Sequence, residues 1–209
     1  MYKYIFPLFF SLFIVFFTQC REKEKTLFTR LSRVETGIDF NNKLTYTEDY
    51  NCFTYRAFFN GGGVGLGDIN NDGLTDVFFC GNLTPSKLYL NKGNFHFEDI
   101  TEKAGVACKG VWATGVAMAD VNGDGLLDIY VCKSGQPTAQ GVRYNELFIN
   151  NGNLSFTEKA KEFGLNDEGL SSHAAFFDFD RDGDLDCYLL NNSLRSVANY
   201  DKNSALRNV

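Results

Sequence analysis

The sequence predicts an all-β protein, built as a partial β-propeller of about three four-stranded blades. Three observations predict it: an acidic loop of nine residues occurs three times, short apolar runs flank each copy, and a strand–turn–strand motif follows the first two copies. The copies start at Asp68, Asp120 and Asp178, so successive copies lie 52 and 58 residues apart. Four strands in about fifty residues is the size of one propeller blade. The 21 Phe and 10 Tyr residues also favour β structure.

The three loops, named loop 1 (68–76), loop 2 (120–128) and loop 3 (178–186), share one residue pattern. Oxygen-bearing side chains occupy positions 1, 3, 5 and 9, and glycine occupies position 6. Carboxylates gathered this closely repel one another unless a cation lies among them. Calcium takes about six to eight oxygen ligands at flexible geometry, whereas magnesium needs a near-octahedral site with several waters. The pattern therefore predicts about three bound Ca²⁺ ions, with the glycine providing a backbone conformation that a Cβ would penalise.

The residues after each loop exclude a helix–loop–helix calcium site. Such a site needs a bidentate glutamate at position 12, but this position holds Phe79, Val131 and Leu189. The runs that flank the loops are short and rich in β-branched and aromatic residues, which is typical of buried strands. We therefore expect strands at 64–67, 116–119 and 174–177 before the loops, and at 77–80, 129–132 and 187–190 after them. A dockerin module, which uses similar loops, is disfavoured for the same reasons.

The second half of each repeat is a predicted hairpin. Residues 87–98 match residues 146–157 at a constant offset of 59, and both contain an Asn/Gly turn between two apolar runs. No third copy follows loop 3. We therefore predict a propeller segment at 61–192, a lead-in at 20–60 that supplies a strand to the first or last blade, and the truncated start of further sequence at 193–209.

The first 19 residues predict export. Lys3 precedes an apolar run at 5–17, which is too short to span a bilayer and resembles the hydrophobic region of a secretory signal. Cys20 follows, and then a charged stretch. This order resembles a bacterial lipoprotein signal, in which Cys20 would be lipidated. Phe17 and Gln19 depart from that pattern, so an ordinary signal peptide or an uncleaved anchor remains the alternative.

The charge of the chain argues against one class of partner, and its cysteine spacing argues against one class of metal site. The chain has 26 acidic and 20 basic residues, and this excess of acid argues against nucleic acid. The sequence contains no C-x-x-C pair, which argues against a zinc site. Cys80 and Cys132 hold equivalent places in successive repeats, so we expect them to fill the core as small apolar residues, rather than to form a disulfide.

Other candidate chemistry has structural explanations. The glycine-rich stretch at 61–67 fits no phosphate-loop pattern and predicts close backbone approach near the propeller axis. His96 and His173 are the two histidines, and His173 stands where the other repeats have Gly63 and Gly115. Neither has grouped partners that would make it catalytic. Trp112 is expected in the core, with a sugar-stacking platform as the alternative. No nucleophile elbow or zinc-protease motif occurs, and the close carboxylate pairs are explained by the loops.

These loops resemble the FG-GAP repeats of integrin α-subunit propellers and, more closely, the VCBS repeats of bacterial exported proteins. The motif at 88–97, with Phe40-Asn41-Asn42 and the stretch at 60–64, is similar to the cartilage acidic protein-like group. That resemblance covers about residues 30–192, without the ASPIC/UnbV segment that the group often carries. It implies backbone carbonyl ligands from Leu74, Leu126 and Asp184. It implies side-chain ligands from Asp68, Asn70, Asp72, Asp76, Asp120, Asn122, Asp124, Asp128, Asp178, Asp180, Asp182 and Asp186.

The resulting hypothesis is an exported, calcium-binding propeller protein without enzymatic activity, which acts in adhesion, binding or scaffolding. It would be lipid-anchored at the outer membrane or cell surface, or lie in the periplasm, and its partner would be an extracellular protein or glycan. The alternative is the propeller portion of a carbohydrate-active enzyme. Turnover of a polysaccharide would favour this alternative, and chelator-sensitive binding without turnover would favour the first hypothesis.

Overall fold

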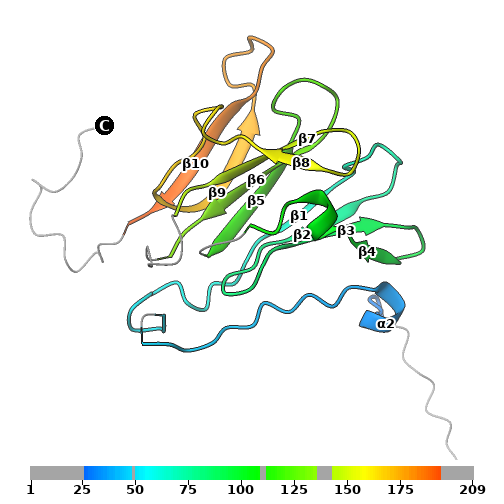
Figure 1. The fold of residues 1–209 in the computed structure, drawn as a ribbon, viewed down its shortest axis with the longest axis vertical. Helices are drawn as coiled ribbons and strands as arrows, with labels where there is room; N and C mark the ends of the chain where they lie inside the picture. The colour runs from blue at the N-terminus through cyan, green and yellow to red at the C-terminus, as the bar shows by residue number, and fades with distance from the viewer. Residues whose placement is uncertain (1–25, 49, 109–111, 136–142, 194–209) are drawn as a thin grey trace, which may run out of the picture. The chain divides into compact units, whose positions relative to one another are not determined.

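The computed structural model describes residues 26–48, 50–108, 112–135 and 143–193 (Figure 1). The predicted signal at 1–19, Cys20 and nearly all of 193–209 lie outside the described residues. The chain divides into two units, Met1–Leu31 and Ser32–Val209. Residues 26–31 of the first unit form neither helix nor strand. The helices of the described residues are too short for a membrane span, and none qualifies as a candidate.

The described residues form an all-β protein with ten strands in three antiparallel sheets (Figure 1). Sheets 1 and 2 each contain four strands in sequence order, and sheet 3 pairs two strands. Sheet 1 comprises β1 (Val64–Gly67), β2 (Asp76–Phe79), β3 (Lys87–Asn91) and β4 (Phe97–Asp99). Sheet 2 comprises β5 (Ala113–Ala119), β6 (Asp128–Lys133), β7 (Glu146–Asn150) and β8 (Phe156–Glu158). Sheet 3 comprises β9 (Leu170–Phe177) and β10 (Asp186–Asn192). Two short helices, α2 (Arg33–Thr36) and α3 (Thr101–Ala104), complete the structure.

The predicted repeat is confirmed twice in full. In sheets 1 and 2, each loop joins the first two strands and each predicted hairpin forms the third and fourth. Sheet 3 has two strands among the described residues. This agrees with the sequence, in which no hairpin motif follows loop 3.

The lead-in supplies no strand among residues 26–48 and 50–60, contrary to the expectation from the sequence. Its backbone instead turns on its own polar side chains: Asn51 Oδ1 accepts from the Phe53 and Thr54 N–H groups at 2.9 and 3.1 Å. The lead-in attaches to sheet 1 by side chains rather than by a ladder. Asn42 and Asn82 exchange two hydrogen bonds of 2.7 and 2.9 Å. Such local bonds compete with strand pairing.

The sheets pack through equivalent residues of their first strands, β1, β5 and β9, which we call the inner strands. Val116 and Met118 of β5 face sheet 1, where a Cβ on Gly65 would lie 3.2 Å from both side chains. On β9, Phe176 occupies the place of Met118 and meets the ring of Tyr130 in sheet 2 at a centroid distance of 5.5 Å. Each sheet therefore presents one apolar face to the sheet before it and another to the sheet after it. Burying a side chain such as Phe78 or Tyr130 stabilises this stack by about 1.5–3 kcal/mol each.

Both ends of the stack expose these packing faces. Val64 and Leu66 of β1 correspond to Val116 and Met118, yet they are 54 % and 64 % exposed. At the other end, Tyr188 of β10 corresponds to the buried Phe78 and Tyr130, and it is 64 % exposed. Leu190 is exposed where Cys80 and Cys132 are buried.

Equivalent positions of the three inner strands approach one another closely, as the glycine-rich stretch predicts. The Gly63 N–H donates to the Thr114 carbonyl. A Cβ on Gly115 would lie 2.4 Å from the Ser172 carbonyl oxygen and 3.0 Å from the Cα of His173. Gly63, Gly115 and His173 thus adjoin one another, in the order of the repeats.

The equivalent cysteines of the first two repeats, Cys80 and Cys132, fill the core. Cys80 and Cys132 are 1 % and 0 % exposed, and the five cysteines among the described residues are free thiols. Burial raises the pKa of each of these two thiols to about 12, so both stay protonated and unreactive.

One buried ion pair joins β6 to β7, with Lys133 Nζ 2.7 Å from Glu146 Oε2.

We predict that Gly115→Ala lowers the free energy of unfolding by about 1–3 kcal/mol, because the added Cβ meets a backbone oxygen that cannot move independently of its strand. Gly65→Ala is the matched control, since its Cβ would meet only the ends of the Met118 and Val116 side chains. Urea unfolding of both variants measures the difference. An equal loss in the two variants would show that backbone contact between β5 and β9 is not the cause.

Candidate metal centre

The first aspartate of each loop organises the turn by accepting backbone N–H groups. Asp68 accepts from Asp72 N at 3.1 Å and from Gly73 N at 2.7 Å. Asp120 accepts from Asp124 N at 3.1 Å and from Gly125 N at 2.8 Å. In loop 3, Asp178 accepts from Gly183 N at 3.2 Å. The same framework therefore occurs in all three loops, and it is least complete in loop 3.

The glycine at position 6 has the conformation that the sequence predicts. Gly73, Gly125 and Gly183 have φ values of 82°, 85° and 100°, which an L side chain rarely adopts. Position 4 is also left-handed in every loop, at Asn71, Gly123 and Arg181. Only the glycine at position 6 was anticipated from the sequence, because position 4 is occupied by three different residue types.

The position-5 aspartate closes the second half of the loop. Asp72 accepts from Leu74 N at 2.8 Å, Asp124 from Leu126 N at 2.9 Å, and Asp182 from Asp184 N at 3.2 Å. The carbonyl oxygens of Leu74, Leu126 and Asp184 accept no hydrogen bond among the described residues. They are therefore available as the position-7 ligands that the resemblance implies.

The position-9 aspartate is the most buried member of loops 1 and 2. Asp76 is fully buried and accepts from Ile69 N at 3.0 Å and from Asn91 N at 2.7 Å. Asp128 does the same with Val121 N at 3.0 Å and Asn150 N at 2.8 Å. Burial raises the pKa of Asp76 and of Asp128, the other loop aspartates add repulsion, and the backbone hydrogen bonds oppose both effects. A cation in the loop would relieve this cost by favouring the ionised carboxylate.

At the position-1 aspartate of loop 1, hydrogen bonding outweighs burial in its effect on the pKa. Desolvation raises the pKa of Asp68, but the backbone N–H groups of Gly73 and Asp72 outweigh it, so the pKa lies below its usual value. In loop 3, the Asp184 N–H and carboxyl group lower the pKa of Asp182, while the bond to Asp182 raises that of Asp184. Loops 1 and 3 thus each hold a carboxylate that is ionised readily.

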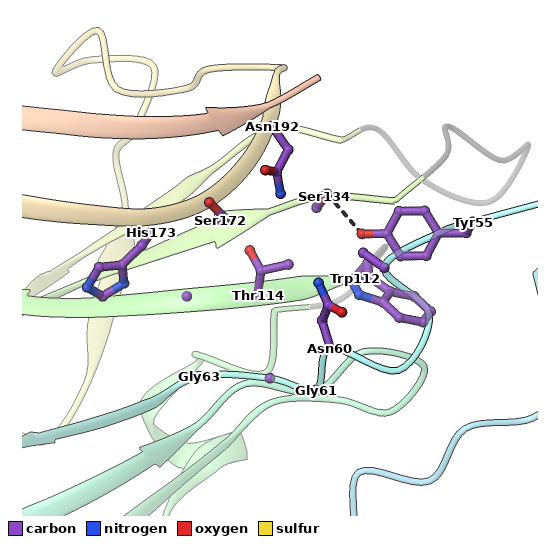
Figure 2. A pocket seen from close by; sticks show the side chains of 13 residues that line it. Tyr55, Asn60, Gly61, Gly63, Trp112, Thr114, Ser134, Ser172, His173 and Asn192 are labelled. Carbon is purple, nitrogen blue, oxygen red and sulfur yellow. Dashed lines mark hydrogen bonds between the residues drawn. The ribbon is translucent and has the colours of Figure 1, made fainter. Parts of the chain in front are cut away.

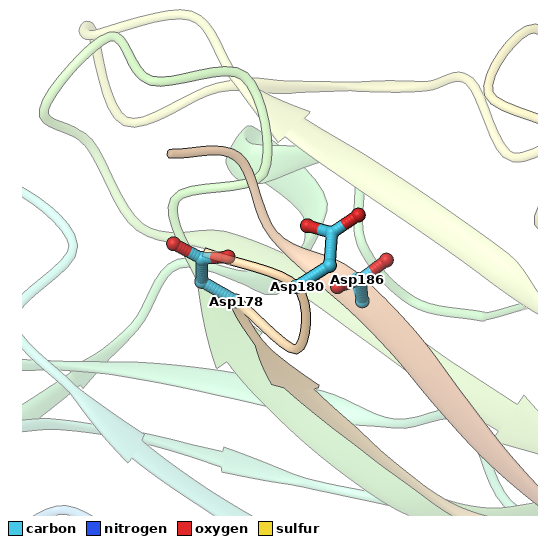
Figure 3. A group of neighbouring side chains, drawn as sticks. All are labelled: Asp178, Asp180 and Asp186. Carbon is cyan, nitrogen blue, oxygen red and sulfur yellow. The ribbon is translucent and has the colours of Figure 1, made fainter. Parts of the chain in front are cut away.

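Loop 3 brings three acidic side chains together. Carboxylate oxygens of Asp178, Asp180 and Asp186 all lie within 4.8 Å of one another (Figure 3). No other group of acidic, His or Cys side chains meets this criterion within the described part of the chain. In loops 1 and 2 position 3 is an asparagine, whose amide donates to the position-5 aspartate at 3.0 and 2.9 Å. An all-oxygen set of this kind suits a hard cation such as Ca²⁺.

Two asparagines that the sequence motifs did not single out as functional residues connect the loops to the hairpins. Asn91 donates its amide to the Thr75 carbonyl at 2.8 Å and accepts from Gly93 N at 2.9 Å. Asn150 donates to the carbonyls of Ile69 and Leu127 at 2.8 and 3.1 Å. Asn150 therefore joins its own loop to loop 1 of the preceding sheet. The matching position of the two asparagines in the hairpin motif was the available signal.

We predict that Asn150→Ala lowers the free energy of unfolding by about 1–3 kcal/mol, because a buried carbonyl (Ile69) and a part-buried carbonyl (Leu127) lose their donor. Asn151→Ala is the control, since Asn151 is exposed and its amide bonds only to side chains of its own hairpin. Thermal and urea unfolding provide the measurement. If both variants lose the same stability, the connection between sheets 1 and 2 does not depend on Asn150.

A family model described as FG-GAP-like repeat matches residues 68–131 and 138–189, which is more than half of the chain. The chain belongs to the FG-GAP-like repeat family. Its matched segments contain all three loops, so the family pattern includes the hydrogen-bonded loop framework.

Curated relatives carry the name cartilage acidic protein 1. The protein of Xenopus tropicalis is 32 % identical over 136 residues, which is 65 % of this chain and 20 % of that protein. The protein of Mus musculus is 39 % identical over 69 residues, covering 33 % of this chain and 11 % of that protein. The human protein is 38 % identical over 69 residues. The chain therefore spans about a fifth or less of the length of these relatives.

Proposed function

We propose that this protein is an exported, calcium-binding β-propeller repeat protein that binds or scaffolds other macromolecules at the cell surface and has no catalytic activity. The observation that carries the proposal is the set of Asp178, Asp180 and Asp186 oxygens within 4.8 Å, inside a loop framework that recurs twice more. Membership of the FG-GAP-like repeat family supports the binding role.

The same residues support three ion sites. In each loop, the position-1 aspartate is already fixed by backbone N–H groups, so its carboxylate is held in place for an ion. In loops 1 and 2 the position-9 aspartate is held between the loop and the neighbouring hairpin. Calcium at these positions would neutralise the carboxylates and tie each loop to its sheet. Its role would be structural, because the carboxylates that could act as acids or bases are committed to the loops.

The packing faces support a propeller. Three successive sheets adjoin through β1, β5 and β9, and both ends of the stack expose residues that are buried between the sheets. In a closed propeller these end faces would pack against further blades. Sheet-by-sheet packing of this kind makes a rigid platform, which suits a binding or scaffolding protein.

Export and anchoring remain proposals from the sequence. The apolar run at 5–17 and Cys20 support a lipoprotein signal, and millimolar extracellular calcium would fill sites of modest affinity. The partner would be an extracellular protein or glycan. The similarity to cartilage acidic protein 1 supports a place in the same group of proteins.

We predict that the full chain binds about three Ca²⁺ ions and that Asp180→Ala removes about one of them. Asp180 is exposed and belongs to the loop 3 cluster, so its removal should leave the fold intact. Isothermal titration calorimetry gives the stoichiometry, and a chelator should lower the melting temperature of the unmodified protein.

Glu168→Gln is the matched control, because Glu168 is exposed and its side chain makes no bond among the described residues. Its calcium stoichiometry should equal that of the unmodified protein. Absence of calcium uptake, or the same stoichiometry in Asp180→Ala and the unmodified protein, would contradict the proposal.

A further inference from the structure

A pocket of about 290 Å³ lies where the three inner strands adjoin, away from the calcium loops (Figure 2). We call it the inner-strand pocket. Its wall comes from four parts of the chain: the lead-in, the stretch before β1, the ends of sheet 2 strands, and sheet 3. No residue of loops 1 to 3 lines it. A ligand here would therefore be independent of the metal sites.

One wall of the pocket contains a buried donor without a partner. Trp112 is 1 % exposed, and its ring stacks on Tyr50 at 5.4 Å and meets the edge of Tyr55 at 4.8 Å. Its Nε1 has no hydrogen-bond partner among the described residues, and Figure 2 shows this nitrogen on the side of the ring that faces the pocket. Buried N–H groups are almost always bonded, so this one is suited to an acceptor supplied by a ligand.

Two amides face the pocket from opposite sides. Asn60 comes from the lead-in and Asn192 from the end of β10. Neither side chain makes a hydrogen bond among the described residues. Each amide offers both a donor and an acceptor, which matches a ligand whose groups can do both.

Hydroxyl groups between the amides offer mainly lone pairs. Thr114 Oγ1 donates to the Ser171 carbonyl at 2.7 Å, and Ser172 Oγ donates to the Leu190 carbonyl at 3.1 Å. Ser134 Oγ accepts from the Tyr55 hydroxyl at 3.0 Å and keeps its own proton for a ligand. No Asp, Glu, Lys or Arg lines the pocket, and His173 is the one imidazole in its wall, so no permanently charged side chain is there to pair with a charged ligand.

The size of the pocket sets the size of the ligand. A volume of about 290 Å³ lies just below the usual range for small-molecule sites, about 300–1,000 Å³, so the ligand must be small. The floor consists of Gly61, Gly62 and Gly63, where a Cβ on Gly63 would lie 2.8 Å from the Thr114 carbonyl. The backbone can approach a ligand here because these residues have no side chains.

We infer that the inner-strand pocket binds an uncharged, polyhydroxylated molecule of the size of one sugar ring. Each hydroxyl of such a molecule can both accept from Trp112 or an amide and donate to a hydroxyl oxygen of the wall. The aromatic cluster presents the edge of Trp112, not its face, so recognition depends on hydrogen bonds rather than on stacking.

The single tryptophan of the chain allows a direct test, because its fluorescence reports on this pocket alone. The full chain, saturated with calcium, is titrated with D-glucose, D-galactose, L-fucose and N-acetyl-D-glucosamine. D-glucuronate and D-glucosamine serve as charged counterparts. We expect a saturable change with at least one neutral sugar at millimolar concentration and none with the charged pair. Saturation-transfer NMR on the same samples detects binding that leaves the fluorescence unchanged.

Asn60→Ala and Asn192→Ala should each weaken binding of the neutral sugar by about three- to tenfold, because each removes one amide from the wall. Asn41→Ala is the matched control, as Asn41 is exposed and lies outside the pocket, and it should bind as the unmodified protein does. Circular dichroism establishes that each variant is folded. If one alanine variant is not, Asn60→Ser or Asn192→Ser replaces it.

The inference is overturned if no neutral sugar binds by either method, if the charged sugars bind as well as the neutral ones, or if the pocket variants bind as Asn41→Ala does. Calcium stoichiometry of the same samples is measured separately. Sugar binding without calcium uptake would support the pocket inference and contradict the proposed function. Calcium uptake without sugar binding would support the proposed function and overturn the pocket inference.

Discussion

The buried aspartate at position 9 of each complete repeat is the constraint on which the structure depends. Asp76 and Asp128 each accept one N–H from their own loop and one from the third strand of their sheet. A single carboxylate thus fixes the turn, the start of the second strand and the hairpin together. Burial raises its pKa, so the same group creates an electrostatic cost inside the fold. The outward-facing loop oxygens are arranged where a cation would offset this cost.

Much of this arrangement could be predicted because it repeats. Period, alternation and the acidic pattern specify β1, β2 and the hairpin strands, and their equivalents in sheet 2. The matching positions of Asn91 and Asn150 in the hairpin motif mark both residues, but the bond from Asn150 to loop 1 could not be predicted, since it depends on how the sheets stack. The prediction that the lead-in supplies a strand was wrong for a related reason. Its apolar and aromatic residues look like a strand, but Tyr50, Tyr55 and Phe58 serve to surround Trp112.

The stack of sheets explains why equivalent residues can differ in size. Cys80 and Cys132 face the next sheet and are small and buried, whereas Leu190 at the same repeat position is exposed. Gly65 and Gly67 of β1 leave room for Val116, Met118 and Leu127 of the following repeat. Large residues on one face are therefore matched by small residues on the opposing face, as close packing of two sheets requires. The exposed Val64 and Leu66 are large apolar residues equivalent to Val116 and Met118. The outer face of β1 therefore has the composition of a packing face.

The close approach of the inner strands both requires glycine and leaves open space beside it. Close approach requires glycine at Gly63 and Gly115, and it removes side chains that would otherwise fill the space beside them. Repeats one and two share this feature, but the third carries His173 there. The wall is therefore asymmetric although the sheets are repeats of one another. Asn60 and Trp112 stand at the same repeat position, eight residues before Asp68 and Asp120, yet they are different residue types. The polar groups that could select a ligand therefore arise where equivalent positions carry different residues. Specific recognition in a repeat protein requires such departures, because equivalent residues around an axis would present the same group several times and could not distinguish one end of a small molecule from the other.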